Sequence, residues 1–190
     1  MPGVSAPRRI WYLITDEAYL AVTVFRFNQW LITRRSLPVR ALAGPLAHLL
    51  RTWARQLTKV DLPPTARIAE GLFIGHASSI FIHEAAVIGR CCSVNHEVTI
   101  GVGGLGDRRG VPVLGDCVFV SAGAKVFGNI EIGDHVLIRP NAVLSRSVPS
   151  CSAVGGNPAV ITGPARPEDV ERVLFGESHV YKPGAAIPTA

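Results

Sequence analysis

The chain has 190 residues, 48% of them hydrophobic, which allows one sizeable folded domain with an appendage and excludes a largely disordered protein. Charged residues make up only 17% of it, a low share for a soluble monomer, so we expect another subunit to cover part of the surface. The net charge of +5 suits an anionic ligand or an acidic membrane surface, but no run of aromatic and basic residues resembles a nucleic-acid-binding module.

Residues 1–59 are predicted to form an N-terminal helical segment. Asp16 and Glu17 interrupt its first apolar run before a signal-peptide core can form, and no apolar stretch reaches the roughly 20 residues that span a bilayer. We therefore expect a cytoplasmic protein. Within residues 15–58, apolar residues recur at three- and four-residue steps, which predicts amphipathic helices. This pattern is carried by Leu20, Val24, Phe27 and Leu31.

Pro38 divides the helical segment in two, because the residue before a proline avoids the helical conformation. A second helix is predicted from about residue 39 to residue 57, with Pro45 near its start. One side of this helix is basic, through Arg40, Arg51, Arg55 and Lys59. That side is either a solvated face or a contact for a membrane surface or an acidic partner, and the sequence leaves both open.

Residues 60–163 carry an internal repeat, in which an aliphatic residue returns every six positions. Its members are Ile82, Ile88, Val94 and Ile100 and, after an interruption, Leu114, Val120, Val126, Ile132, Ile138 and Leu144. The next position is often small, as at Gly89, Gly115 and Gly133. A period of six is neither the 3.6 of a helix nor the alternation of a strand. It predicts short strands joined by tight turns, with small residues at corners where bulk would clash or a positive φ is needed.

Three such units close a triangular coil, and stacked coils make a mainly β fold, a parallel β-helix of hexapeptide repeats. From residue 164 to residue 190 the repeat is lost. There PEDVERVLF predicts a short helix with Pro167 in its first turn, followed by a tail. The four cysteines have no CxxC or Cys/His ligand spacing, so we expect reduced thiols, no disulfide framework and no metal site. They are Cys91, Cys92, Cys117 and Cys151.

The segment GVGGLGDRRGVP interrupts the repeat between Ile100 and Leu114, and its glycines predict a protruding loop. A loop that leaves a regular solenoid is usually functional, since the fold does not need it. Its Arg108 and Arg109 either hold a carboxylate or phosphate group or lie at a solvated loop tip.

Three of the six histidines, His76, His83 and His96, lie in the coils that precede this loop. Small neighbours leave the imidazole of His76 accessible. Asp61 precedes His76 by fifteen residues, close to one coil of about eighteen. Its carboxylate can therefore stack near His76 and make it a better general base, although spacing alone does not separate this dyad from an accidental pair. His135, in GDHVLI, is expected to be a solvent-facing turn residue.

Residues 60–163 resemble the serine acetyltransferase group of hexapeptide-repeat acyltransferases. The similarity runs through VDLPPTARIAEGLFIGHASSIFIHEAAVIG, VTIGVGGLGDRRGVPVLGD, VFVSAGAKVFGNIEIGDHVLI and GGNPAVITG, and FRFNQWL in the helical segment also fits. The resemblance implies a left-handed β-helix that transfers an acetyl group from acetyl-CoA to a hydroxyl. It also implies a trimer or a dimer of trimers, with CoA between neighbouring β-helices, and we expect a homotrimer here.

By position, His76 matches the family's catalytic His and Asp61 its carboxylate partner, which implies that His76 takes the proton of the acceptor hydroxyl. Positions that line CoA in the family correspond to Gly103 and Gly104 in the loop, Ala122, Gly123 and Lys125 in SAGAK, and Asn157, Pro158 and Ala159 in the last coil.

Departures from the family concern the acceptor. The family has an Asp directly before the catalytic His, where this chain has Gly75, and a second active-site His in the loop, which is missing here. Asp residues of the family's longer helical region that help to bind serine have no counterpart. We therefore expect an altered acceptor pocket, with Gly75, His96, Arg108 and Arg109 as candidate acceptor-binding residues.

Three functions follow from these observations. The first is an acetyl-CoA-dependent O-acetyltransferase for a hydroxyl of a sugar, a polysaccharide precursor or an amino-acid-like metabolite. The second is a serine O-acetyltransferase, in which Arg108 or Arg109 binds the carboxylate and His96 or another group takes the place of the missing His. The third is a non-catalytic β-helix scaffold, against which the retained Asp61 and His76 argue.

Overall fold

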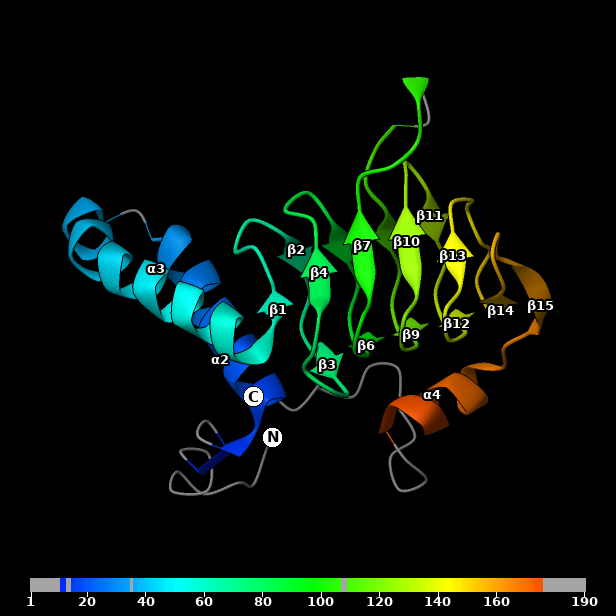
Figure 1. Cartoon of the computed structure of the whole chain (residues 1–190), viewed down its shortest axis with the longest axis horizontal. Helices are drawn as coiled ribbons and strands as arrows, with labels where there is room; N and C mark the ends of the chain where they lie inside the picture. Colours follow the sequence, from blue (N-terminus) through cyan, green and yellow to red (C-terminus); the bar gives the residue numbers. More distant parts are fainter. Residues whose placement is uncertain (1–10, 13–14, 35, 107–108, 176–190) are drawn as a thin grey trace.

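The computed structural model describes residues 11–12, 15–34, 36–106 and 109–175, which Figure 1 shows as a β-helix with a helical hairpin at its N-terminal end. The hairpin consists of α2 (Glu17–Ile32) and α3 (Leu37–Thr58). Pro38 lies in the first turn of α3, where its missing N–H is not needed, so the predicted division of the helical segment is confirmed. Pro45, however, lies inside α3 and not near its start, because the helix begins two residues earlier than predicted, at Leu37.

Fifteen short strands form three sheets within the described residues. Sheet A contains β1 (Val60–Asp61), β4 (Ile80–Ile82), β7 (Thr99–Gly101), β10 (Lys125–Phe127) and β13 (Val143–Leu144). Sheet B contains β2 (Arg67–Ile68), β5 (Val87–Ile88), β8 (Val113–Leu114) and β11 (Glu131–Ile132). Sheet C contains β3 (Phe73–Ile74), β6 (Ser93–Val94), β9 (Phe119–Val120), β12 (Leu137–Ile138), β14 (Ser152–Gly155) and β15 (Val160–Pro164). All neighbours pair in parallel except β14 and β15, which are antiparallel.

The aliphatic residues of the six-residue repeat form the core of the β-helix. All ten of them are at most 4% exposed, so one aliphatic side chain of each repeat unit points into the core. Ala21 and Phe25 of α2 belong to the same buried cluster, so α2 closes the end of the first coil. Arg26 ties the two parts together, since its guanidinium donates to the carbonyl oxygens of Ile68 (2.7 Å) and Ala69 (2.5 Å). Burial lowers the pKa of Arg26 from its usual value.

Lack of space, not positive φ, explains the small residues that follow the repeated aliphatic residues. A Cβ atom added to Gly89, Gly115 or Gly133 would lie closer than 3.0 Å to atoms of the next coil, and none of the three has a positive φ. Positive φ falls two residues later, for example at Cys91 and Cys117. Lack of space for a side chain and a positive φ therefore fall on two different residues of each turn, whereas the sequence pattern assigned both to the small residue.

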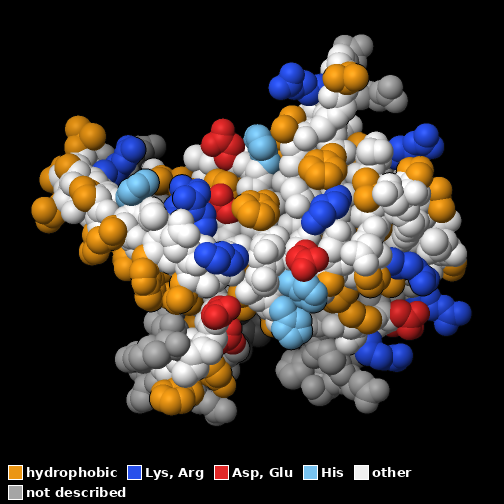
Figure 2. All heavy atoms as spheres, viewed as in Figure 1, with side chains coloured by type: hydrophobic (Ala, Val, Ile, Leu, Met, Phe, Trp, Pro, Cys, Tyr) orange, Lys and Arg blue, Asp and Glu red, His pale blue; other side chains and the backbone are white. Residues whose placement is uncertain are grey.

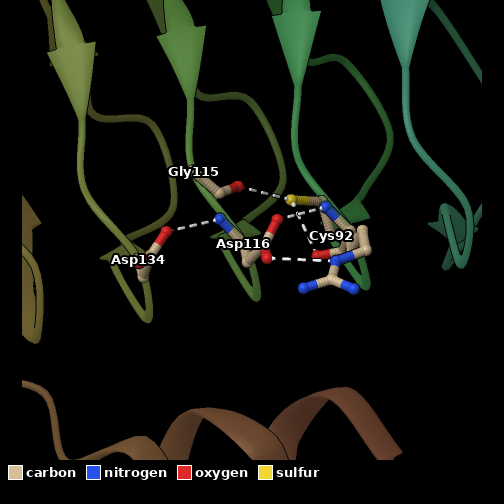
Figure 3. A network of polar contacts seen from close by, with 5 residues as sticks. Cys92, Gly115, Asp116 and Asp134 are labelled. Carbon is tan, nitrogen blue, oxygen red and sulfur yellow. Dashed lines mark hydrogen bonds and ion pairs between the residues drawn. The ribbon is translucent and has the colours of Figure 1, made fainter. Parts of the chain in front are cut away.

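The Asp residues that follow Gly115 and Gly133 link successive coils at one corner (Figure 3). Asp116 Oδ1 accepts from the backbone N–H of Arg90 at 2.6 Å, and Asp134 Oδ1 accepts from the backbone N–H of Asp116 at 2.7 Å. Cys92 Sγ donates to the carbonyl oxygen of Gly115 at 3.2 Å. The two Asp contacts satisfy turn N–H groups, those of Arg90 and Asp116.

The predicted C-terminal helix is confirmed as α4 (Pro167–Phe175), which packs beside sheet C. The predicted tail lies outside the described residues. His135 is not solvent-facing as predicted, because its Nε2 lies 3.4 Å from Glu171 Oε1 in α4 and its side chain is half-buried. A six-residue pattern could not reveal this, since α4 lies outside the repeat. No helix in the described ranges is long and apolar enough to cross a membrane.

Candidate active site

His76 lies in a widened turn between β3 and β4. Ile74 and Ile82 are eight residues apart instead of six, so this corner carries two extra residues, and Ser79 adopts a positive φ of 51° to close it. The side chain of His76 is exposed as a result. The insertion thus lifts an imidazole out of an otherwise regular coil, as the sequence predicted from its small neighbours.

His96 lies one coil further along the same edge. Its ring meets that of His76 edge-on, with the ring centroids 5.8 Å apart. The Nδ1 atom of His96 is buried and has no hydrogen-bond partner among the described residues. The structure therefore brings together two histidines that are twenty residues apart in the sequence, and one of them has an unsatisfied nitrogen.

Asn95 accounts for the glycine that precedes His76. A Cβ atom at Gly75 would collide with Asn95 Oδ1, so the Asn95 side chain occupies the space that a larger residue at this position would need. Asn95 was not among the predicted site residues. Its relation to Gly75 depends on coil register, which places Gly75 N–H on the carbonyl oxygen of Val94.

A cleft of about 380 Å³ opens beside His76 toward the start of α2. Its wall consists of Tyr12, Thr15, Asp16, Glu17, Ala18, Gly75, His76 and Ala77. Asp16 caps α2 by accepting from Tyr19 N–H at 3.0 Å, whereas Glu17 is exposed. We predicted no counterpart to the family's serine-binding Asp residues, and neither Asp16 nor Glu17 was among the predicted site residues. The only signal of Asp16 and Glu17 in the sequence was that they interrupt an apolar run.

The carboxylate of Asp61 is engaged elsewhere in this structure. Arg51 Nη2 lies 3.1 Å from its Oδ1 and Arg55 Nη1 lies 3.5 Å from its Oδ2. No hydrogen bond or ion pair joins Asp61 to His76 in the described part of the chain. Asp61 pairs in register with Phe81, twenty residues on, because the widened turn lengthens this coil beyond eighteen residues. The Asp61–His76 dyad stays a prediction.

The glycine-rich loop leaves the opposite edge of sheet A (Figure 1). The strands of this sheet are parallel, so the turn at His76 lies where they start and the loop lies where they end. β7 separates the two edges by three residues, roughly 10 Å at 3.3 Å per residue. Gly103 pairs with Gly110 at the base of the loop, and Arg109 is exposed. Arg108 lies outside the described residues.

His83 lies on the edge where the loop departs, since its backbone N–H donates to the carbonyl oxygen of Ile100 at 2.8 Å. Its Nδ1 accepts from the backbone N–H of Ala85 at 3.1 Å, which leaves Nε2 to carry the proton of the neutral ring. His83 is therefore placed apart from His76 and His96.

Most of the predicted CoA positions share the edge of His76. Ala122 and Gly123 form the turn before β10, stacked on the turn of His96 through the hydrogen bond from Gly123 N–H to the His96 carbonyl oxygen. Asn157, Pro158 and Ala159 stack on the same edge at β13. Lys125 donates from Nζ to the carbonyl oxygen of Glu97, whereas Gly103 and Gly104 lie in the loop on the opposite edge.

The thiols do not add a nucleophile to this edge. Burial, the largest cause, raises the pKa of Cys92 and of Cys117 to about 12, and it also raises the pKa of Cys91, so all three stay protonated near neutral pH. Cys151 is exposed, in the turn before β14. Within the ranges that the structure describes, no three His, Cys, Asp or Glu side chains gather as a metal site.

The three parallel sheets and their short strands define the class of left-handed hexapeptide-repeat β-helix proteins. A scan of the chain against models of protein families gave no match. The chain is 38% identical over 144 residues to the serine acetyltransferase of Synechococcus elongatus, covering 75% of this chain and 56% of the relative. It is 34% identical over 163 residues to the serine acetyltransferase of Mycobacterium tuberculosis, covering 86% of this chain and 68% of the relative.

Among solved structures, the serine acetyltransferase of Brucella abortus in complex with coenzyme A superposes with a TM-score of 0.67 at 32% identity. The match covers 79% of this chain and 57% of that one. The chain therefore belongs to the serine acetyltransferase family, and it spans little more than half the length of two of these three relatives.

Proposed function

We propose that the protein is an acetyl-CoA-dependent O-acetyltransferase in which His76 is the general base. The observation that supports it most is the exposed imidazole of His76 in a cleft, on an edge shared with Ala122 and Gly123 and with the last coil. Membership of a family named for acetyl transfer, with one neighbour in complex with coenzyme A, supports acetyl-CoA as the donor.

The chemistry requires one base and a proton path. His76 accepts the proton of the acceptor hydroxyl while the oxygen attacks the thioester carbonyl carbon. The tetrahedral intermediate then collapses with cleavage of the C–S bond, and the imidazolium returns its proton to the sulfur, which gives the acetyl ester and free CoA. His96, edge-on to His76, limits the orientations of the catalytic ring.

We also propose a homotrimer, because one chain does not join the two edges of sheet A. The His76 turn and the glycine-rich loop lie at opposite ends of the strands. A neighbouring copy can bring its loop, with Arg109 and Gly103, to the His76 edge of the first. The low share of charged residues supports such a covered surface.

Serine is the acceptor that the relatives support best, and the comparisons therefore favour the second function of the sequence analysis over the first. The cleft adds a physical reason. Asp16 and Glu17 place carboxylates beside His76, and an ammonium group is their natural partner. Glu17 is the better candidate, since Asp16 already caps α2.

A second candidate, a hydroxyl on a molecule without an amino group, is favoured by Gly75 and Asn95. Where the family has a carboxylate before the catalytic His, this chain presents the neutral amide of Asn95 under Gly75. An amide both donates and accepts hydrogen bonds, which suits hydroxyl groups, and it lacks the negative charge with which a carboxylate attracts an ammonium group.

Thiol release from acetyl-CoA, measured with serine, homoserine, amino sugars and nucleotide sugars, separates these candidates. We expect turnover with serine, and Glu17→Gln should raise the KM for serine at least about tenfold with kcat little changed. Glu131→Gln, an equally exposed change on sheet B, is the control and should leave KM unchanged. Turnover of sugars but not of serine would favour the second candidate. No turnover with any acceptor and no CoA binding by calorimetry would leave the scaffold function.

A further inference from the structure

The free flank of α3 carries a continuous row of exposed apolar side chains. We call it the apolar stripe: Leu42, Leu46, Leu49, Trp53 and Leu57. Their spacing of three or four residues places them along one side of the helix, and each is between 51% and 87% exposed. The side of α3 that packs against α2 instead carries buried small residues such as Ala47 and Ala54. Figure 2 shows hydrophobic side chains gathered along this outer flank.

The basic charge of the protein is concentrated in the same hairpin. Residues 17–61 contain seven Lys or Arg and two Asp or Glu, a balance of +5 that equals the net charge of the whole chain. α3 itself contains no acidic residue. Arg34 adds a guanidinium over the ring of the exposed Trp30, 4.3 Å from its centroid, at the end of α2. The hairpin therefore combines leucines, tryptophans and excess positive charge.

We propose that the hairpin of α2 and α3 docks on the surface of an anionic lipid bilayer, with the apolar stripe inserted among the acyl chains nearest the headgroups. Leucine and tryptophan on one side of a helix with no acidic residue is the composition of helices that lie in the membrane interface. Trp53, within the apolar stripe, suits the headgroup level, where the indole ring is preferred. No described helix can span the bilayer, so α3 would lie along it.

Charge decides between a bilayer and a second copy of the chain as the occupant. Two hairpins facing each other would bring two clusters of +5 together, whereas anionic headgroups attract each of them. Asp61 neutralises part of Arg51 and Arg55 and is already included in this balance. The docked hairpin would hold the first coil, and the cleft at His76, close to the lipid surface, because that cleft is partly walled by the start of α2.

Vesicle co-sedimentation of the full chain tests this proposal. The probes are vesicles of phosphatidylcholine alone and vesicles in which about one third of the lipid is phosphatidylglycerol. We expect binding to the anionic vesicles at low salt to be at least about tenfold tighter than to the neutral ones, and to weaken as salt is raised. The double change Leu42→Glu and Leu49→Glu should weaken binding to anionic vesicles at least about tenfold.

The double change Val160→Glu and Ile161→Glu is the matched control. It adds the same two charges to side chains that are 60% and 56% exposed on β15, at the far end of the β-helix, and it should bind vesicles nearly as the wild type does. Circular dichroism checks that both variants fold. If the stripe double variant does not fold, Leu42→Glu alone, at a side chain 87% exposed, replaces it.

Equal binding to neutral and anionic vesicles, or equal loss in both double variants, would overturn the proposal. So would an absence of vesicle binding in a protein whose oligomer, measured by light scattering, becomes smaller on Leu42→Glu and Leu49→Glu. That last result would assign the apolar stripe to a contact between copies of the chain. None of these outcomes depends on acetyl transfer.

Discussion

Gly89→Ala is expected to destabilise the β-helix strongly, although it adds only one methyl group. A Cβ atom at Gly89 would lie closer than 3.0 Å to the carbonyl carbon and oxygen of Gly115 and to Asp116 Oδ1. The Gly115 backbone cannot retreat, because its N–H is bonded to the carbonyl oxygen of Ile132 in the next coil at 2.8 Å. Asp116 is held as well, by the backbone N–H of Arg90 (Figure 3).

The expected loss in the free energy of unfolding is about 3 kcal/mol, at the upper end of the usual cost of overpacking, since backbone atoms have to move. For a chain of this length, that loss corresponds to a fall in Tm of roughly 6–12 °C. Two other glycines give graded controls. Gly44→Ala in α3 meets no atom within 4 Å and should raise stability by up to about 1 kcal/mol. Gly75→Ala meets only the end of the Asn95 side chain, which can rotate, and should cost less than about 1 kcal/mol.

Thermal and urea unfolding at one protein concentration would measure all three variants, since a concentration change alone shifts the Tm of an oligomer. The expected order of stability is Gly44→Ala, Gly75→Ala and then Gly89→Ala. A Gly89→Ala protein that melts within about 2 °C of the wild type would refute the steric reason for glycine at the coil corners.

Three further predictions concern the site and the thiols. His76→Ala should lower kcat at least about 100-fold with CoA affinity little changed, and Asp61→Asn should lower kcat less. Turnover assays measure kcat and calorimetry measures CoA affinity. An unaffected kcat in His76→Ala would show that His76 is not the base. In the native protein, one thiol should react quickly with Ellman's reagent at pH 8, and Cys151→Ser should remove that phase, because Cys151 is exposed and the other three thiols are buried. The free energy of unfolding should fall above about pH 8.5, because Cys92 loses its proton there in the unfolded chain but keeps it in the folded chain, where its pKa is about 12. The fall is up to about 1.4 kcal/mol per pH unit for each thiol whose pKa is raised by folding. Cys92→Ala should flatten this slope in urea titrations, and an unchanged slope would assign it to other groups.

The β-helix was predictable because its signal is repeated. Each repeat unit places an aliphatic residue inward at the same position, as in the unbroken series from Leu114 to Leu144. A wrong assignment of one buried position is therefore corrected by the next unit. Features outside the repeat were less accessible. The half-buried His135 depends on Glu171, thirty-six residues away in a helix that the repeat does not place.

Among the site residues, some features were likewise predictable from the sequence and others depended on contacts between distant segments. The exposure of His76 followed from its small neighbours and from the family resemblance. Its meeting with His96 needed the coil register, and the carboxylates of Asp16 and Glu17 needed the packing of α2 against the first coil. None of these contacts leaves a periodic pattern in the chain.

The two extra residues between Ile74 and Ile82 connect the main features of the site. They widen the turn enough to expose His76 and to leave a cleft against the start of α2. They also lengthen the first coil to twenty residues, which aligns Asp61 with Phe81 and leaves its carboxylate to Arg51 and Arg55. A departure from the repeat is thus the step that turns a structural coil into a candidate site.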